Sequence, residues 1–347
     1  MKTKLLTLVL LFTNLLSVSG QVVYVDSNSG NDSNPGTELS PFRSLKKATE
    51  IVRNAENNVW GIKINPGIYL LEHLLSIETD KINPDNRIII EASVLPDEPD
   101  WTPEKMPVIF SVAPKGELPE DYHFVASFLI NESHVTIRGL KFTGYAYPNT
   151  RYFPIARLNK EKSDLYVEQC LFTGDEDASH LQVGIIANGD GVRADHCIFY
   201  NVRNSVVFWQ DSGNGFKKGN GITNSIIYGA TQSGIWTSWP DADFVFKNNV
   251  VSNCLNFWIK NADNPTVYTI DNCLIVDNTH NLTIADNAGV HPQNFEIIEK
   301  NVKKEGTVYL VHKSAVTHED LPIDYLHVQP GTPGFGLGAG LFKTRNK

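Results

Sequence analysis

Short apolar runs recur through the middle of the chain, between residues 165 and 289. Five segments share one form, in which two alternating apolar runs are joined by one small polar or thiol residue: LYVEQCLF, VRADHCIF, NGITNSII, FVFKNNVV and VYTIDNCLI. The joining residues are Cys170, Cys197, Ser225, Asn249 and Cys273, which are 27, 28, 24 and 24 residues apart. A repeat of this length is typical of a solenoid.

A third apolar run follows each of these pairs after a turn: GIIAN, SVVFW, GIWTS, NFWIK and NLTIA. Three strands and three turns per repeat predict an all-β fold, a single-stranded parallel β-helix with three strands per coil. The coils are predicted to span about 134–164, 165–191, 192–219, 220–243, 244–266 and 267–289. The repeat fades after His291.

A different pattern precedes the coils. The stretch SPFRSLKKATEIVRNA places Leu45, Ala48, Ile51 and Val52 on one face of a helix. The end of a β-helix leaves apolar core and backbone groups uncovered, so it needs a cap. The pattern therefore predicts an N-terminal capping helix over residues 44–55.

The run YVDSNSGNDSNPGTELSPFRSLKKA, followed by IKINPGIYLL, RIIIEASV and VIFSV, resembles the opening of secreted right-handed parallel β-helix proteins of the pectin-lyase-like superfamily. HVTIRGLKF resembles their first regular coil, and DYLHVQPGTPGFGLGA their closing segment. The resemblance implies one domain over 21–347, with a capping segment of about 21–60, regular coils of about 134–289 and a closing segment of about 290–347. The superfamily contains lyases, hydrolases, esterases and non-catalytic proteins, so it implies a fold rather than one activity.

Residues 1–20 have the pattern of a signal peptide. Two lysines precede an apolar run from Leu5 to Leu16, which SVSG follows, so cleavage is predicted after Gly20. The apolar run is too short to span a membrane. The first cysteine, Cys170, lies far from the junction, which argues against a lipoprotein. We therefore expect a secreted or periplasmic monomer without a membrane span.

The formal net charge of the chain is -9 at pH 7. This charge argues against nucleic acid as a partner, because nucleic-acid binding depends on the neutralisation of phosphates. An anionic sugar polymer would need a cation or a local basic patch on such a protein.

The four cysteines of an exported chain raise the question of disulfides. Cys170 and Cys197 occupy the same turn of neighbouring coils, where equivalent residues lie about 4.8 Å apart, so a bridge between them is conceivable. Buried free thiols are the default interpretation.

The alternation of the third run predicts which side chains leave the core. Ile235 and Phe257 are predicted to point inward, whereas Trp209, Trp236 and Trp258 point outward. Trp239 and Asn188 lie beside them, and these residues form the predicted substrate-binding set: Trp209, Trp236, Trp239, Trp258 and Asn188. Outward indoles suit stacking on the C–H faces of sugar rings. The alternatives are that insertion loops cover the tryptophans, or that an error of one residue in the register exchanges the two faces.

Acidic residues follow the third run in every coil, at Asp190, Asp211, Asp241, Asp243, Asp263 and Asp286. Asp is a common turn residue, which explains most of this series. Carboxylates on neighbouring coils would nevertheless lie about 5 or 10 Å apart. Paired-acid glycosidases use separations of this kind. Asp211, Asp241 and Asp243 flank the tryptophans and are candidate catalytic residues.

Lys260 is a candidate base, because the alternation predicts that it points outward beside Trp258. Elimination from a uronic acid needs a base and a cation that neutralises the sugar carboxylate. Desolvation could lower the pKa of such a lysine, and Arg157 and Arg193 are candidate partners. β-Helix polysaccharide lyases use basic side chains in this way, so the resemblance supports the hypothesis by analogy. The alternative is a solvated lysine that shields an aromatic face.

The segment GDEDASH contains Asp175, Glu176 and Asp177 in one predicted turn. Oxygen-rich clusters can bind calcium, although no spaced calcium motif is present. The alternative is a solvated acidic loop and a protein without a cofactor.

Two functional hypotheses follow, with polysaccharide as the partner in both. The first is a polysaccharide lyase or glycoside hydrolase that acts on the outer face of the β-helix. The second is a non-catalytic carbohydrate-binding or surface adhesion module. A structural fibre segment is less consistent with the predicted signal peptide and the absence of heptads.

Overall fold

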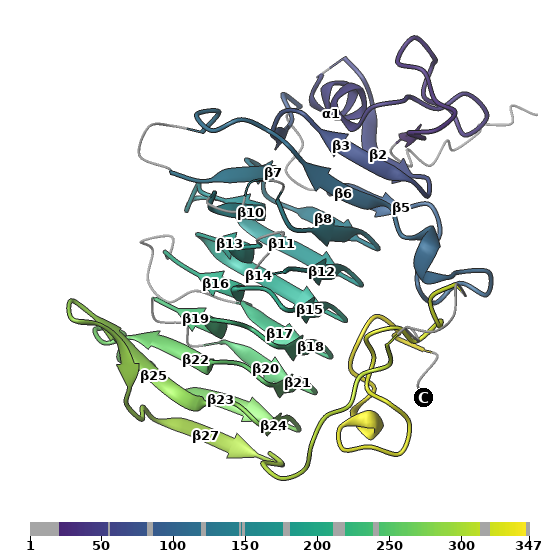
Figure 1. The fold of residues 1–347 in the computed structure, drawn as a ribbon. Helices are drawn as coiled ribbons and strands as arrows, with labels where there is room; N and C mark the ends of the chain where they lie inside the picture. Colours follow the sequence, from purple (N-terminus) through teal and green to yellow (C-terminus); the bar gives the residue numbers. More distant parts are fainter. Residues whose placement is uncertain are drawn as a thin grey trace, which may run out of the picture.

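The computed structural model describes residues 21–344, apart from 55, 82–85, 119–122, 146, 148–149, 176–180, 211–218, 239–242 and 313–319. The chain winds through three parallel sheets in turn, one strand in each sheet per coil, and the coils stack into a single column (Figure 1). This arrangement confirms the predicted parallel β-helix. The predicted signal peptide lies outside the described residues.

The ten-stranded sheet contains β1 (Gln21–Val25), β2 (Val59–Ile64), β5 (Ile88–Ala92), β8 (Val135–Arg138), β11 (Ser163–Glu168), β14 (Asp190–Asp195), β17 (Gly221–Thr223), β20 (Val245–Lys247), β23 (Tyr268–Asp271) and β27 (Ile297–Lys300). The eight-stranded sheet contains β3 (Ile68–Leu71), β6 (Val108–Ser111), β9 (Lys141–Thr143), β12 (Leu171–Thr173), β15 (Ile198–Tyr200), β18 (Ile226–Tyr228), β21 (Val250–Ser252) and β24 (Leu274–Val276).

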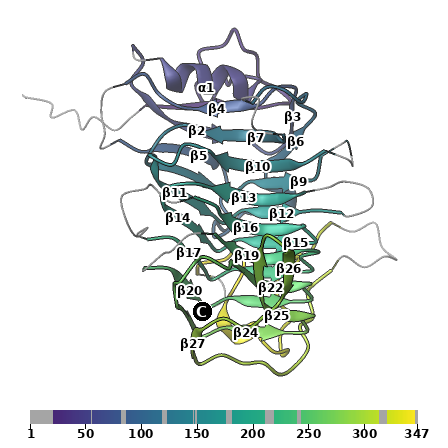
Figure 2. The same cartoon turned by 90° about the vertical axis from the view of Figure 1, so that its left-hand side faces the viewer.

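The nine-stranded sheet forms the third side of each coil. It contains β4 (Leu75–Ile77), β7 (Val125–Ile130), β10 (Tyr152–Arg157), β13 (Val183–Ala187), β16 (Asn204–Phe208), β19 (Ser233–Thr237), β22 (Asn256–Asn261), β25 (His280–Asp286) and β26 (Gly289–Pro292). β26 turns back antiparallel to β25, whereas the pairs from β4 to β25 are parallel. Figure 2 looks onto the outer face of this sheet.

The turns between the ten-stranded and eight-stranded sheets explain the repeated joining residues. The residue before each joining residue is left-handed: Gln169 (φ 52°), His196 (φ 50°), Asn224 (φ 50°), Asn248 (φ 56°) and Asn272 (φ 51°). Asparagine tolerates this conformation better than most residues. The joining residues bond from coil to coil: Cys197 N–H donates to Ser225 Oγ (3.0 Å), and Ser225 N–H donates to Asn249 Oδ1 (2.9 Å). All four cysteines are buried and free, as the default interpretation predicted.

The capping helix is α1 (Leu45–Arg53), and it lies over the N-terminal end of the column (Figure 1). Ser44 is its N-cap and accepts a hydrogen bond from Lys47 N–H (3.1 Å). Leu45, Ala48 and Val52 are buried against the first coil. The predicted capping helix is confirmed, and it is shorter than the predicted range of 44–55 by one residue at its start and two at its end. Two short 3₁₀ helices, Pro103–Lys105 and Phe335–Leu337, lie outside the coils.

The C-terminal segment does not simply cover the last coil. After β27 it runs back along the outside of the eight-stranded sheet, on the right of the column in Figure 1. The reason is that the outward residues of this sheet, including Ile198, Ile226 and Val250, are apolar. Leu326, Leu341 and other residues of the segment bury them in a second apolar cluster.

No helix in the described part of the chain combines the length and apolarity that a membrane crossing requires.

His327 makes the stability of this segment sensitive to acid. Its ring is buried against Phe342, and its Nε2 accepts a hydrogen bond from Leu341 N–H (2.9 Å). Burial lowers the pKa of His327 to about 4, from an ordinary value near 6.5. Between these values the unfolded chain binds the proton and the folded chain does not, so stability falls as the pH falls.

We expect His327 alone to lower the free energy of unfolding by up to about 3 kcal/mol between pH 6.5 and pH 4. His327→Gln has no titrating ring, so its stability should fall less over this range. Urea unfolding of both proteins at several pH values measures the difference. Equal losses of stability in the two proteins would contradict the assignment.

Candidate functional site

The outer face of the nine-stranded sheet carries an apolar ladder across successive coils. Its mid-strand positions pair in the order Leu129, Ala156, Ile186, Val207, Trp236, Ile259 and Thr283. Phe124 and Phe153 pack together beside the N-terminal part of this ladder, with ring centroids 4.1 Å apart. A groove of about 470 Å³ lies over the ladder. Because its lining residues come from successive coils, the groove runs along the axis of the column.

Polar residues form one wall of the groove. Arg151, Gln182, Arg203 and Gln232 line it, and each lies directly before its strand, from β10 to β19. Arg203 Nε donates to Gln232 Oε1 (2.9 Å). His123 lines the N-terminal end of the groove. The described lining residues include two arginines and one histidine, and no aspartate or glutamate.

Two tryptophans line the C-terminal end of the groove, as the alternation predicted. Trp209 is 40% exposed, and its ring lies edge to face with Trp236 at a centroid distance of 6.1 Å. Trp236 Nε1 donates to Asn261 Oδ1 (2.9 Å), which fixes the orientation of the indole. Both indoles therefore have apolar surface at the groove.

The prediction that Trp258 points outward is wrong. Trp258 pairs with the inward residues Ile235 and Leu282, and it is 0% exposed. The predicted register was wrong by one residue in β22, so Ile259 rather than Trp258 occupies the outward ladder beside Trp236. Trp258 stacks on Tyr268 in the core, with ring centroids 5.0 Å apart.

The same shift changes the position of Lys260. It pairs with Thr237, which is buried, and its own side chain is buried rather than outward. Lys260 Nζ donates to Thr266 O (2.8 Å) and lies 5.0 Å from the ring centroid of Phe295. Burial lowers its pKa. The lowered pKa fits the hypothesis of a base, but the position inside the column does not.

The two candidate arginines are far from equivalent. Arg157 is 0% exposed, and its guanidinium donates to Asn188 O (2.7 Å) and Asp190 O (2.8 Å). Burial lowers the pKa of Arg157 to about 10. Arg193 is exposed on the ten-stranded sheet, where its Nε donates to Gly219 O (2.9 Å). Neither residue lines the groove, so neither is placed to neutralise a sugar carboxylate there.

Asn188 does line the groove, as expected of a substrate-binding residue. Its side chain also holds neighbouring coils together. Nδ2 donates to Leu158 O (2.6 Å), and Oδ1 accepts from Gln210 N–H (3.1 Å). A role in sugar binding stays a prediction.

Most of the acidic candidates lie outside the residues that the structure describes. Asp211, Asp241 and Trp239 lie outside the described residues, and so do Glu176 and Asp177 of the predicted calcium loop. Asp175 and Asp243 are exposed and do not line the groove. Among the described residues, no cluster of three histidine, cysteine, aspartate or glutamate side chains could hold a metal ion.

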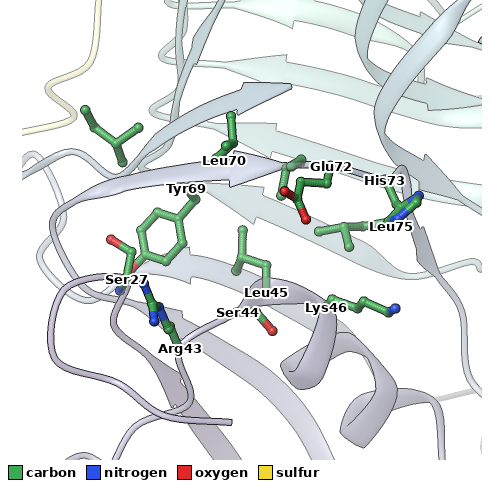
Figure 3. Close-up of a pocket in the computed structure, with 12 residues that line it drawn as sticks. Ser27, Arg43, Ser44, Leu45, Lys46, Tyr69, Leu70, Glu72, His73 and Leu75 are labelled. Atoms are coloured by element: carbon green, nitrogen blue, oxygen red, sulfur yellow. The ribbon is translucent and has the colours of Figure 1, made fainter. Parts of the chain in front are cut away.

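A second cavity, of about 380 Å³, lies between the start of α1 and the uncovered edge of β3 (Figure 3). Its lining combines aliphatic side chains such as Leu45 and Leu70 with Arg43 and Lys46. Tyr69, the aromatic residue of this lining, is buried and donates its hydroxyl proton to a backbone carbonyl of β1 (3.0 Å). The cavity offers no open face of a phenylalanine, tyrosine or tryptophan ring among its described lining residues, so the groove is the stronger candidate for sugar binding.

Comparisons with known proteins bear on the fold. No model of a known protein family matches the chain, and no curated protein matches it in sequence. Among solved structures, a rhamnogalacturonan lyase matches with a TM-score of 0.50 and 17% identity, over 81% of this chain and 73% of that chain.

Two further structures match with lower scores. XylC in complex with xylose has a TM-score of 0.43 and 10% identity, over 84% of this chain and 70% of its own. A GH136 lacto-N-biosidase from Eubacterium ramulus has a TM-score of 0.42 and 10% identity, over 82% of this chain and 65% of its own. Identities this low establish a likeness of fold alone. The chain has a right-handed parallel β-helix fold, similar to that of the rhamnogalacturonan lyase structure.

Proposed function

We propose that this protein is a polysaccharide lyase that binds an acidic polysaccharide along the groove of the nine-stranded sheet. The observation that carries the proposal is the lining of the groove, which combines Arg151, Arg203 and His123 with the indoles of Trp209 and Trp236. The cationic wall gives an acidic chain a local surface that attracts polyanions. One solved structure of the same fold carries the name of a lyase.

The groove has the groups that β-elimination needs. Arg151 neutralises the carboxylate of a bound uronic acid, which makes the proton on the neighbouring ring carbon easier to remove. His123, which lies near the strand next to that of Arg151, takes this proton as the general base. The electron pair forms a carbon–carbon double bond as the glycosidic oxygen leaves, so one new unsaturated end is produced per cleavage. The departing oxygen takes a proton from water, and the hydroxide that remains takes the abstracted proton from His123, which restores the base.

Hydrolysis is the less favoured reaction for this groove. A glycosidase of the common type needs two carboxyl groups beside the scissile bond. None of the described lining residues carries one. Asp211 and Asp241 stay candidates for such a role, because they lie outside the described residues.

A polymer panel tests the proposed reaction. The purified protein is incubated with uronic-acid polymers and with neutral polymers, and the ultraviolet absorbance of unsaturated products is followed together with reducing ends. We expect absorbance to rise with the acidic polymers only, and His123→Ala to abolish the rise while binding persists. New reducing ends without a rise in ultraviolet absorbance would indicate that the protein is a hydrolase and not a lyase. Binding without either signal would indicate a carbohydrate-binding module.

Trp236→Ala is expected to weaken polysaccharide binding by about 10-fold or more, because large aromatic side chains dominate the energetics of such contacts. Tyr309→Ala is a matched control, since Tyr309 is exposed on the C-terminal segment and does not line the groove. Titration calorimetry with one acidic oligosaccharide measures both variants. Equal affinity of Trp236→Ala and Tyr309→Ala would show that the indole does not contact the sugar.

A further inference from the structure

The polar wall of the groove alternates in charge from coil to coil. The residues directly before β10, β13, β16 and β19 are Arg151, Gln182, Arg203 and Gln232. All four line the groove. Along this wall, a coil that contributes an arginine is therefore followed by a coil that contributes a glutamine, and this order occurs twice.

The spacing of this alternation can be compared with a sugar chain. β10 and β16 are separated by β13 in the sheet, so Arg151 and Arg203 stand two coils apart. Adjacent parallel strands are about 4.8 Å apart, which separates the two arginines by roughly 10 Å along the column. An extended chain of pyranose rings advances by close to one strand spacing per sugar. Two coils therefore correspond to two sugars.

Hydrogen bonds hold the second arginine in place for an anion. Gln232 Oε1 accepts from Arg203 Nε (2.9 Å) and from Asn204 Nδ2 (3.1 Å). Asn204 is itself fixed, because its Oδ1 accepts from Ser233 Oγ (2.6 Å). The bond to Gln232 uses Nε and leaves the two terminal nitrogens of Arg203 without a hydrogen-bond partner among the described residues. Two N–H groups of a guanidinium can bind one carboxylate in a bidentate pair.

We propose that the groove selects a polysaccharide in which an acidic sugar alternates with a neutral one, rather than a polymer with an acid on every sugar. Arg151 and Arg203 bind the carboxylates of two acidic sugars, and Gln182 faces the neutral sugar between them through hydrogen bonds to its hydroxyl groups. A carboxylate opposite Gln182 would lose its hydration without gaining a charge partner, which is unfavourable. This inference rests on the proposed binding of acidic polysaccharide in the groove.

Binding of defined oligosaccharides tests the spacing. The alternating probes are oligomers of hyaluronate, unsulfated chondroitin and the rhamnogalacturonan backbone; the probes with an acid on every sugar are oligogalacturonate and oligomannuronate; dextran oligomers are neutral. We expect at least one alternating probe to bind about 10-fold or more tightly than both fully acidic probes, and dextran not to bind. Arg151→Gln and Arg203→Gln should each weaken the best alternating probe about 10-fold or more. Arg193→Gln, on the ten-stranded sheet, is the matched control and should not change binding.

An added charge should shift the preference in the opposite direction. Gln182→Arg completes a row of three arginines, so we expect tighter binding of the fully acidic probes and no gain for the alternating ones. Gln232→Ala should weaken the alternating probes as Arg203→Gln does, because it releases the guanidinium. Thermal unfolding of each variant establishes that it is folded before binding is measured.

The outcomes separate this inference from the proposed function. Fully acidic probes that bind the natural protein as tightly as the best alternating probe would overturn the inference while leaving an acidic-polysaccharide groove in place. Failure of every acidic probe to bind, or binding that neither arginine substitution changes, would overturn the proposed function itself.

Discussion

Trp258→Ala is expected to lower the free energy of unfolding by about 3–5 kcal/mol. The side chain is 0% exposed and lies among Phe244, Phe246 and Tyr268, at centroid distances of 5.3, 5.6 and 5.0 Å. Its Nε1 also donates to Thr237 Oγ1 (2.9 Å), and this hydroxyl would lose its partner. Urea unfolding at neutral pH measures the loss.

Trp209→Ala removes the same kind of side chain from a partly exposed position. Because Trp209 is 40% exposed and lies at the groove, its replacement should cost about 1 kcal/mol or less. The two tryptophans were expected to be equivalent from the alternation of the sequence. Similar costs for the two substitutions would contradict the observed register of β22.

Arg157→Met is expected to lower the free energy of unfolding by about 3 kcal/mol. The substitution removes two hydrogen bonds from a charged donor to the carbonyl oxygens of Asn188 and Asp190, each worth roughly 1.5–3 kcal/mol. Part of this loss is offset, because the substitution also removes a charge whose burial is unfavourable, as the lowered pKa of Arg157 indicates. Chemical unfolding at neutral pH measures the effect.

Arg193→Met is the matched control for Arg157→Met. The side chain of Arg193 is exposed, so its replacement should change stability by about 0.5 kcal/mol or less. If Arg157→Met lowered the free energy of unfolding as little as Arg193→Met does, the hydrogen bonds from the buried guanidinium to the two carbonyl groups would not stabilise the fold.

The sequence was sufficient to predict the coils, because their pattern repeats in register with the turns. Asparagine recurs where the backbone becomes left-handed. Cysteine, serine and asparagine recur at the next position, where side chains bond from coil to coil. The helix was equally clear, since Ser44 is a strong N-cap and the apolar spacing that follows is helical. The path of the C-terminal segment was not predicted, because only the fold reveals which face of a sheet lacks a cover.

The error in β22 has a physical cause. Phe257 and Trp258 are both apolar and both buried, so alternation alone could not decide which of them pairs with Ile235. Counting from the joining residues decides it. The inward residue lies nine positions after Cys197, Asn249 and Cys273, at Val206, Trp258 and Leu282. The coil of Ser225 has one extra residue before Ile235, and this residue shifted the predicted alignment.

Arg151 and Arg203 were missed because each lies before its strand rather than within it. Alternation assigns a face only to residues inside a strand, and residues in the preceding turn have no predicted direction. A signal was nevertheless present, since arginine and glutamine alternate directly before four successive strands of one sheet. Recognising it requires the correct register, which the structure supplies.

A crystal structure with a bound acidic oligosaccharide tests whether the groove of the nine-stranded sheet is the binding site. We expect sugar rings over Ile186, Val207 and Trp236, with a carboxylate of the sugar within hydrogen-bonding distance of Arg203. A sugar bound instead in the cavity between α1 and β3, or on the outer face of another sheet, would contradict the assignment of the groove as the binding site.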